Sequence, residues 1–284
     1  MNITTQFEAT SLADLELAPF ASVPESASMC EAVDAMNAID ATCAVIVGDD
    51  GPAGILTDRD VSQRAVEHPE LWTHSVTEMM TADARALPET ATVLQALQLM
   101  NERRLRHVVV IDASGELSGV ASDTSLVKVI DQLLHKQSVQ EDHQPGAQHG
   151  ILFIDFTGLA TAKPVTVYPS DPLETAIHHI RVRAIGSVLV CDERGALVGV
   201  LTERDLLRKV ACKVRDLRSE SVGDYMTRDP VSLSPRDMIG DGFHAMAVHS
   251  FTHLPLVAES GRPVGIASFR DLAEYLETTV TAAS

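Results

Sequence analysis

The chain has 284 residues, a length at which about two domains are expected. Its formal net charge of −18 argues against a nucleic-acid partner, which needs a basic protein surface, and against docking on an anionic membrane. Hydrophobic residues make up 45% of the chain, so two proper apolar cores can be built.

Targeting signals and cysteine motifs are missing from the sequence. No apolar run approaches the roughly 18 residues of a membrane-spanning helix, and residues 1–19 have neither the basic nor the apolar region of a signal peptide. The cysteines follow no CxxC or metal-binding spacing. Cys43 and Cys191 lie in apolar runs, where a thiol acts as a small hydrophobe. These observations favour a cytoplasmic protein.

The sequence of residues 1–66 predicts an arm and a first repeat. Residues 1–17 are predicted to form a loosely held arm whose leucines pack on a neighbouring surface. The first repeat covers about 18–66, and a capping box at Ser28 and Glu31 marks the start of its first helix. The predicted elements are a strand at 20–24, a helix at 28–38, a strand at 43–47, a turn at 49–51, a strand ending at 56 and a helix at 58–65.

The same order of elements returns three times. A second repeat covers about 75–137, and a polar linker with Pro145 and Gly146 follows at 138–162. An apolar patch at 151–154 in this linker is predicted to dock as an extra strand. The third repeat covers about 163–212 and the fourth about 221–280, within a second half that spans 163–284. We predict that each half forms its own core.

One short stretch recurs in every repeat and fixes how the repeats are grouped. It consists of a glycine, two apolar residues, a hydroxyl residue, two variable residues and an Asp or Ser, at 54–60, 119–125, 199–205 and 265–271. The copies lie 65 or 66 residues apart within each half and 145 or 146 apart between halves. The chain therefore consists of two similar halves, and each half consists of two similar repeats. Each hydroxyl can cap a helix, and the acid suits its positive N-terminus.

These four copies resemble CBS domains, the cystathionine-β-synthase type of repeat, arranged as two tandem pairs called Bateman modules. The resemblance covers about 20–137 and 163–280. It implies an α/β (α+β) fold of four β-α-β-β-α repeats, paired about pseudo-twofold axes. In that family two modules often stack into a disc, either within one chain or between two chains, and the second case would make this protein a homodimer.

The resemblance also implies a ligand class. Clefts between paired CBS repeats commonly hold AMP, ADP, ATP or S-adenosylmethionine, and a carboxylate can accept hydrogen bonds from the ribose hydroxyls. The implied ligand-binding residues are Thr57, Asp60, Thr166, Thr202, Arg204, Asp205, Ser232, His253, Ser268, Arg270 and Asp271, with weaker candidates at Arg59, Arg106, His107 and Ser122. The second half carries the fuller motif, so we expect the tightest binding there, intermediate binding at repeat 1, and little at repeat 2, where Ser125 replaces the acid.

Each candidate also has a plain structural interpretation. The hydroxyls and acids can serve only as helix caps, the arginines can be solvated helix residues, and His107 and His253 can be buried histidines rather than phosphate contacts. No catalytic motif and no metal spacing is found, so neither an enzyme nor a catalytic cofactor is expected. The sequence predicts a regulatory protein for energy sensing and signal transduction, acting on an unknown partner protein. The alternative is a structural adaptor with degenerate sites.

Overall fold

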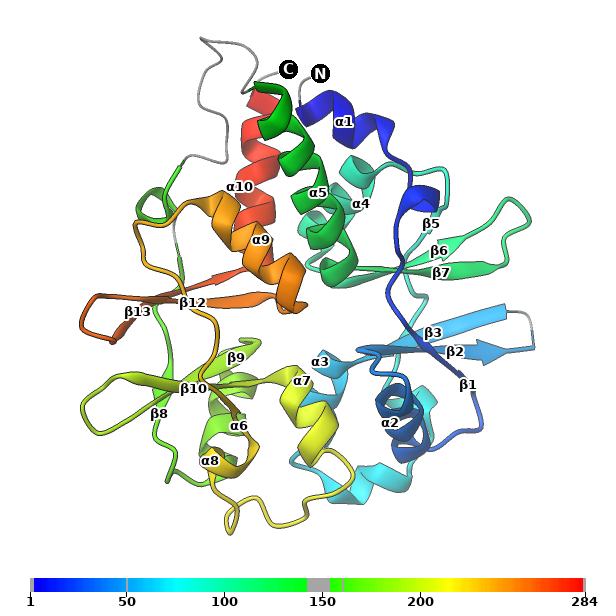
Figure 1. Ribbon diagram of the computed structural model, residues 1–284. Helices are drawn as coiled ribbons and strands as arrows, with labels where there is room; N and C mark the ends of the chain where they lie inside the picture. The colour runs from blue at the N-terminus through cyan, green and yellow to red at the C-terminus, as the bar shows by residue number, and fades with distance from the viewer. Residues whose placement is uncertain (1–2, 50, 142–153, 160, 283–284) are drawn as a thin grey trace.

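The computed structural model describes residues 3–49, 51–141, 154–159 and 161–282, and it confirms a mixed α+β chain with four repeats (Figure 1). The middle of the predicted linker lies outside the described residues, and so does most of the apolar patch at 151–154. The described elements follow the predicted order in repeats 1 to 3, and in repeat 4 a single parallel bridge from Leu233 to Leu256 stands in place of the first strand. The internal repetition is therefore structural.

The first half contains two repeats that meet through their sheets. Repeat 1 consists of β1 (Ala21–Pro24), α2 (Met29–Ala38), β2 (Cys43–Gly48), β3 (Gly51–Thr57), α3 (Asp58–Asp60) and the π-helical turn η2 (Val61–Ala65). The short helices η3 (Pro69–Thr73) and η4 (Val76–Glu78) lead to β4 (Thr81–Ala82). Repeat 2 consists of β5 (Ala86–Pro88), α4 (Val93–Arg103), β6 (His107–Ile111), β7 (Leu117–Ser122) and α5 (Asp123–Glu141).

The second half repeats this arrangement. After η6 (Phe156–Gly158), repeat 3 consists of β8 (Thr166–Val167), α6 (Leu173–Val182), β9 (Ser187–Cys191), β10 (Leu197–Thr202), α7 (Glu203–Asp205) and the π-helical turn η7 (Leu206–Val210). The connection carries α8 (Val222–Tyr225) and β11 (Thr227–Arg228). Repeat 4 consists of α9 (Ile239–His249), β12 (His253–Val257), β13 (Pro263–Ser268) and α10 (Phe269–Ala282).

The sheets share one topology. In repeat 1, β1 runs parallel to β2 and β2 runs antiparallel to β3, with Ala44 opposite Leu56. The outer neighbour of the last strand comes from the segment before the partner repeat: β4 pairs with β3, and β11 pairs with β10. Single bridges from Ala18 to Val120 and from Ala162 to Ile266 complete the pattern in the other two repeats. Each repeat is therefore tied to its partner by backbone pairing.

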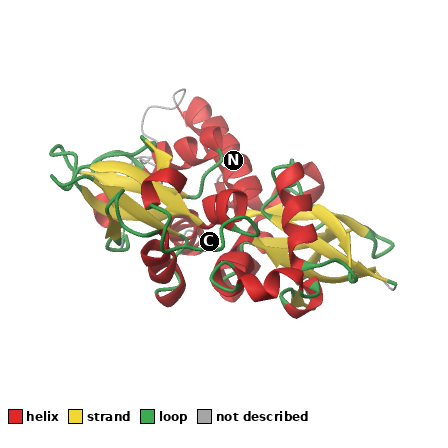
Figure 2. Cartoon of the chain, turned by 90° about the horizontal axis from the view of Figure 1, so that it is seen from below, coloured by secondary structure: helices red, strands yellow, loops and turns green. Residues whose placement is uncertain are grey.

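The two large apolar cores, however, do not follow the halves. One core combines repeats 1 and 3, with Met36 and Ile177 among its buried residues, and the other combines repeats 2 and 4, with Ile130 and Phe243. In Figure 1, α4 and α5 of the first half lie beside α9 and α10 of the second half, and Figure 2 shows helices between the sheets on either side. The prediction of a separate core for each half is wrong, because each half has amphipathic helices whose apolar faces are covered by the helices of the other half.

The N-terminal arm is part of the fold rather than loosely held. It forms the helix α1 (Ile3–Ala9), whose Phe7 is fully buried in the core of repeats 2 and 4, and Leu12 is buried in the same core. The side chain of Leu17 lies against Gly119 so closely that a Cβ there would be 2.3 Å from Leu17 Cδ1. In the second half, Phe156 has the same relation to Gly242 in α9. Because Gly119 and Gly242 have no side chains, they leave the space that Leu17 and Phe156 occupy.

A disulfide joins the two halves. Cys30 at the start of α2 is bonded to Cys212, which follows η7, across 182 residues of sequence. Cys43 and Cys191 remain free and buried, as predicted from their apolar surroundings. The pairing escaped the sequence analysis because motifs report local spacing, whereas this bond depends on the contact between repeats 1 and 3.

Candidate functional site

The recurring hydroxyl and acid form a reciprocal capping box in three repeats. At the start of α7, the backbone N–H of Thr202 donates to Asp205 Oδ2 at 3.0 Å, and the N–H of Asp205 donates to Thr202 Oγ1 at 3.1 Å. The pairs Thr57 with Asp60 and Ser268 with Asp271 make the same bonds. In repeat 2, Ser125 takes the place of the acid, and its hydroxyl accepts from the Ser122 N–H at 2.7 Å.

The capping box leaves only one oxygen of each carboxylate for a ligand. Each hydroxyl also donates to Oδ2 of its acid at 2.7 Å, so Oδ1 is the remaining acceptor. Asp205 Oδ1 accepts from Lys209 Nζ at 2.7 Å and from Thr227 Oγ1 at 3.0 Å, and Asp60 Oδ1 lies 3.8 Å from Arg64. No described residue donates to Asp271 Oδ1. Asp271 therefore has the most available carboxylate oxygen of the three.

Two cavities lie beside the capping boxes of the second half. The first, which we call the Asp271 cleft, has a volume of about 210 Å³ and is lined by Ser268 and Asp271. The second, the Asp205 cleft, has a volume of about 370 Å³ and is lined by Thr202 and Asp205. Each cleft is closed on its far side by the partner repeat: Val165 of repeat 3 lines the first, and Val231 at the start of repeat 4 lines the second.

The predicted site residues divide between these clefts and the rest of the surface. The Asp271 cleft brings together Ser268, Arg270, Asp271, Arg59, Arg106 and His253. The Asp205 cleft brings together Thr202, Arg204, Asp205, Arg106, His107 and His253. Neither cleft is lined by Thr57, Asp60, Ser122, Thr166 or Ser232. Side chains alternate between the faces of a strand, so with Lys163 and Val165 facing the cleft, Thr166 points away and is exposed.

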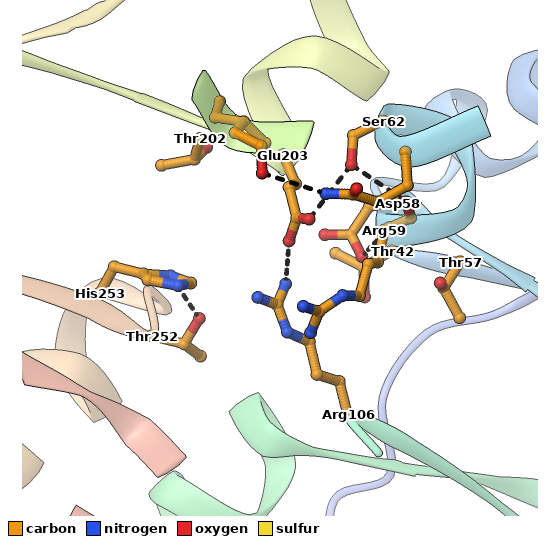
Figure 3. A network of polar contacts seen from close by, with 12 residues as sticks. Thr42, Thr57, Asp58, Arg59, Ser62, Arg106, Thr202, Glu203, Thr252 and His253 are labelled. Carbon is orange, nitrogen blue, oxygen red and sulfur yellow. Dashed lines mark hydrogen bonds and ion pairs between the residues drawn. The ribbon is translucent and has the colours of Figure 1, made fainter. Parts of the chain in front are cut away.

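A buried charged network joins the clefts at the centre of the molecule (Figure 3). Arg106 of repeat 2 forms an ion pair with Glu203 of repeat 3, whose side chain is 1% exposed. Ser62 Oγ of repeat 1 donates to the other carboxylate oxygen of Glu203 at 3.1 Å. Arg106 lines both clefts, and the first half therefore contributes a residue to both cavities of the second half.

Sequence reasoning missed the acids of this network. Asp58, Asp123 and Glu203 occupy the same place in their repeats, directly after the capping hydroxyl, and Phe269 takes that place in repeat 4. Burial raises the pKa of Asp58 to about 7, although Arg106 acts in the opposite direction. Desolvation also raises the pKa of Asp123. The position was interpreted as variable, but its acid in three of four repeats was a usable signal.

The two histidines predicted as site residues, His107 and His253, are neutral near pH 7. Burial, followed by repulsion from Arg106, lowers the pKa of His107 and of His253 to about 3. His107 Nε2 lies 2.9 Å from Thr42 Oγ1, and His253 Nδ1 lies 3.3 Å from Thr252 Oγ1. Neither ring supplies a positive charge near neutral pH. Their role in the clefts is that of a neutral donor or acceptor, and the cationic groups are the arginines.

The described residues form neither a metal-binding cluster nor a membrane-spanning helix. No group of three or more His, Cys, Asp or Glu side chains among them is arranged to hold a metal ion. None of the described helices combines the length and the apolar character that a membrane crossing requires.

A family comparison identifies the repeats. The family model for the CBS domain matches residues 12–67, 76–132, 156–212 and 222–278. The chain belongs to the CBS-domain family. These four matches follow the four repeats seen in the structure, and two tandem pairs of CBS domains fit both the matched ranges and the backbone pairing between neighbouring repeats.

Three proteins illustrate what the chain is similar to. An uncharacterised protein encoded in the ribosomal RNA operon of Thermofilum pendens is 29% identical over 67% of this chain and 62% of its own length. A CBS domain-containing protein of Arabidopsis thaliana is 25% identical over 87% of this chain and 49% of its own length. The chain thus spans about half to two thirds of these relatives. A crystal structure from Methanocaldococcus jannaschii, 16% identical, matches with a TM-score of 0.74 over 92% of this chain and 98% of that one.

Proposed function

We propose that this CBS-domain chain is a regulatory protein that binds adenosine-containing ligands in the Asp271 and Asp205 clefts. The observation that carries the proposal is the cavity beside Asp271, whose Oδ1 faces no donor from the described residues. A ribose has two neighbouring hydroxyl donors, and a carboxylate oxygen can accept from them. Val165, Leu189 and Ile266 supply an apolar lining suited to a purine ring.

Ligand occupancy would be passed to a partner protein through the arrangement of the two halves relative to each other. Both clefts are built from repeats 3 and 4, and both also contain Arg106 from the first half. A ligand that contacts Arg106 therefore interacts with both halves at once, and it favours the arrangement of the halves that it fits best. This is the physical basis for the energy-sensing and signalling role, which involves AMP, ADP, ATP or S-adenosylmethionine as regulatory ligand.

The remaining parts of the proposal concern what the protein does not do and where it acts. We propose a non-catalytic cytoplasmic protein that binds no nucleic acid or membrane, and that acts on its partner alone or as a homodimer. The disulfide between Cys30 and Cys212 is the feature that counts against a cytoplasmic location, because disulfides persist mainly in oxidising compartments.

Titration calorimetry with adenosine, AMP and S-adenosylmethionine tests ligand binding. We expect wild type to bind, and we expect Asp271→Ala and Asp205→Ala each to remove binding at its own cleft. The matched control is Asp60→Ala, which removes the same capping acid from a repeat whose Asp60 lines neither cleft. A charge-assisted hydrogen bond contributes about 1.5–3 kcal/mol, so the loss should be roughly ten- to a hundredfold.

The competing function is a structural adaptor without ligands. It is favoured by the capping boxes, which satisfy the hydroxyls and one carboxylate oxygen with no ligand present. If no adenosine compound binds to folded wild type, or if Asp60→Ala weakens binding as much as Asp271→Ala, the ligand proposal is wrong and the adaptor function takes its place.

A further inference from the structure

The Asp271 cleft carries more positive than negative side chains. Its lining includes only two carboxylates, those of Asp123 and Asp271. Four cationic side chains face the same cavity: Arg59, Arg106, Lys163 and Arg270. Three of them are arginines that come from repeats 1, 2 and 4, so the fold rather than one basic segment gathers them.

Among the described residues, only one of these four cations is held in an ion pair: Arg106 pairs with Glu203, which lies outside the lining of this cleft. Arg59 donates to the neutral carbonyl of Ala184 at 2.9 Å. Among the described residues, no ion pair or hydrogen bond engages Arg270 or Lys163. Burial lowers the pKa of the Arg270 guanidinium, and repulsion from Arg59 and Arg106 lowers it further. A group of cations that repel one another around a cavity is suited to an anionic ligand.

The Asp205 cleft has the opposite balance. Five carboxylates line it: Asp58, Asp123, Glu203, Asp205 and Asp229. Four arginines line it, and each already has an acceptor in the protein. Arg106 pairs with Glu203, Arg204 and Arg208 pair with Asp40, and Arg228 donates to the Gly223 carbonyl at 2.9 Å. Asp40 and Lys209, the ion-pair partners outside the lining, carry opposite charges, so the lining and its ion pairs together keep an excess of one negative charge.

From these two linings, and on the basis of the function proposed above, we propose that the two clefts sort adenosine ligands by charge. The Asp271 cleft takes an adenosine that carries phosphate, and the Asp205 cleft takes an adenosine with a cationic tail, such as a sulfonium compound. Each cleft offers the ribose the equivalent capping carboxylate of its own repeat, Asp271 or Asp205, so the ribose does not distinguish the clefts. The discrimination comes from the groups around the tail.

The physical reason is that charges at the centre of the molecule are poorly screened. Asp58 is 6% exposed and Glu203 is 1% exposed, and both line only the Asp205 cleft. In a partly buried site, a like charge on the ligand is repelled and an opposite charge is attracted far more strongly than in water. A phosphate next to these acids would be repelled. A sulfonium or ammonium group would supply positive charge to a lining that has more carboxylates than arginines.

The experiment measures three probes by titration calorimetry at pH 8, above the raised pKa of about 7 that burial gives Asp58. Adenosine has no charged tail, AMP has an anionic tail, and S-adenosylmethionine has a cationic sulfonium. Asp271→Ala and Asp205→Ala identify the cleft that each probe occupies. We expect AMP binding to fall at least tenfold only in Asp271→Ala, and S-adenosylmethionine binding to fall at least tenfold only in Asp205→Ala.

Charge variants then test the cause. Lys163→Gln with Arg270→Gln neutralises the excess positive charge of the Asp271 cleft and should weaken AMP at least tenfold while adenosine affinity stays within about twofold. Asp58→Asn with Asp229→Asn removes two negative charges from the Asp205 cleft and should weaken S-adenosylmethionine in the same way. Asp229 is exposed, so Asp229→Asn alone gives a folded variant if the buried substitution disturbs the protein.

The outcomes separate this inference from the proposed function. If adenosine binds through Asp271 and Asp205, but AMP and S-adenosylmethionine show the same cleft preference or the charge variants leave both unchanged, charge sorting is wrong and the ligand site stands. If adenosine, AMP and S-adenosylmethionine all fail to bind, the proposed function itself has failed.

Discussion

The two modules start from the same capping motif and end with different cavities. Thr57 with Asp60 in the first module and Thr202 with Asp205 in the second make equivalent hydrogen bonds. Both clefts nevertheless lie beside capping boxes of the second module, although first-module side chains such as Arg106 also line them. In the first module, an apolar cluster of strand residues fills the space between the sheets, with Val45, Ile55 and Val120 buried and Phe20 and Leu117 packed against them.

This comparison shows that the motif and the ligand site are separate properties. The hydroxyl and the acid are explained by the helix start, which needs a cap in every repeat whether or not a ligand binds. A ligand site also needs empty volume and unsatisfied polar groups, and these depend on the side chains that face the motif from the partner repeat. The predictions below test this distinction, beginning with the largest expected effect.

The sharpest test of how the modules are joined is a core substitution. Phe243 is fully buried in the core that repeats 2 and 4 share. Phe243→Ala should lower the free energy of unfolding by about 3–5 kcal/mol, because it leaves a cavity that the neighbours fill only partly. Since the core belongs to both modules, we expect both to unfold in one transition, measured by thermal and urea denaturation.

The control for this test is Val182→Ala, at a side chain that is 64% exposed, where little change is expected. Two separate transitions in Phe243→Ala, with the first module melting as in wild type, would contradict the shared core.

Reduction of the disulfide should have the next largest effect. The bond between Cys30 and Cys212 closes a loop of 182 residues, and a native disulfide typically contributes about 2–4 kcal/mol. We expect Cys212→Ser to lower the free energy of unfolding by that amount and to leave both clefts able to bind. The control is Cys30→Ser with and without dithiothreitol, which should show no further loss. Equal stability of oxidised and reduced wild type would contradict a structural role for the bond.

Acid should destabilise the protein through its buried histidines. The pKa of His107 is about 3 in the folded protein and 6.5 in the unfolded chain, so the unfolded chain binds the extra proton between these values. Stability is therefore present above pH 6.5 and is lost as the pH falls toward 3. We expect His107→Gln to reduce the loss of stability between pH 7 and pH 5, measured by urea denaturation.

The matched control is His178→Gln, at an exposed histidine of α6, which should leave the pH dependence as in wild type. If both substitutions change the acid sensitivity equally, burial of His107 is not its cause.

The smallest expected effect compares the caps directly. Thr57→Ala and Thr202→Ala should each cost about 1 kcal/mol of stability, because each removes an equivalent N-cap hydroxyl. Only Thr202 lines a cleft, so only Thr202→Ala should also change ligand affinity. Equal losses of affinity in the two variants would show that the cap position, rather than the cavity, determines binding.

The sequence predicted the fold well because its information was repeated. Four copies of the Gly54 stretch in register gave the element order and the grouping into two pairs, and the structure and the family match confirm both. The shared cores and the disulfide were not predictable in the same way. Both depend on how helices of one half cover those of the other, and no local pattern reports which surfaces meet.

The candidate site was predictable only in part, for a similar reason. Asp205, Asp271 and the arginines were found by position, and the structure places them at cavities. The acids Asp58 and Glu203 were overlooked because attention to the repeated hydroxyl and final Asp made the intervening residues look variable. Which repeats have cavities follows from packing between sheets, as the cluster around Phe20 illustrates.

The most direct measurement of the central claim is a crystal structure of the chain grown with AMP. The claim is that the second module binds the adenosine ligand and the first does not. We predict a nucleotide in the Asp271 cleft, with its ribose hydroxyls donating to Asp271 Oδ1 and its phosphate beside Arg270. A nucleotide bound at Asp60, with both clefts of the second module empty, would contradict the account.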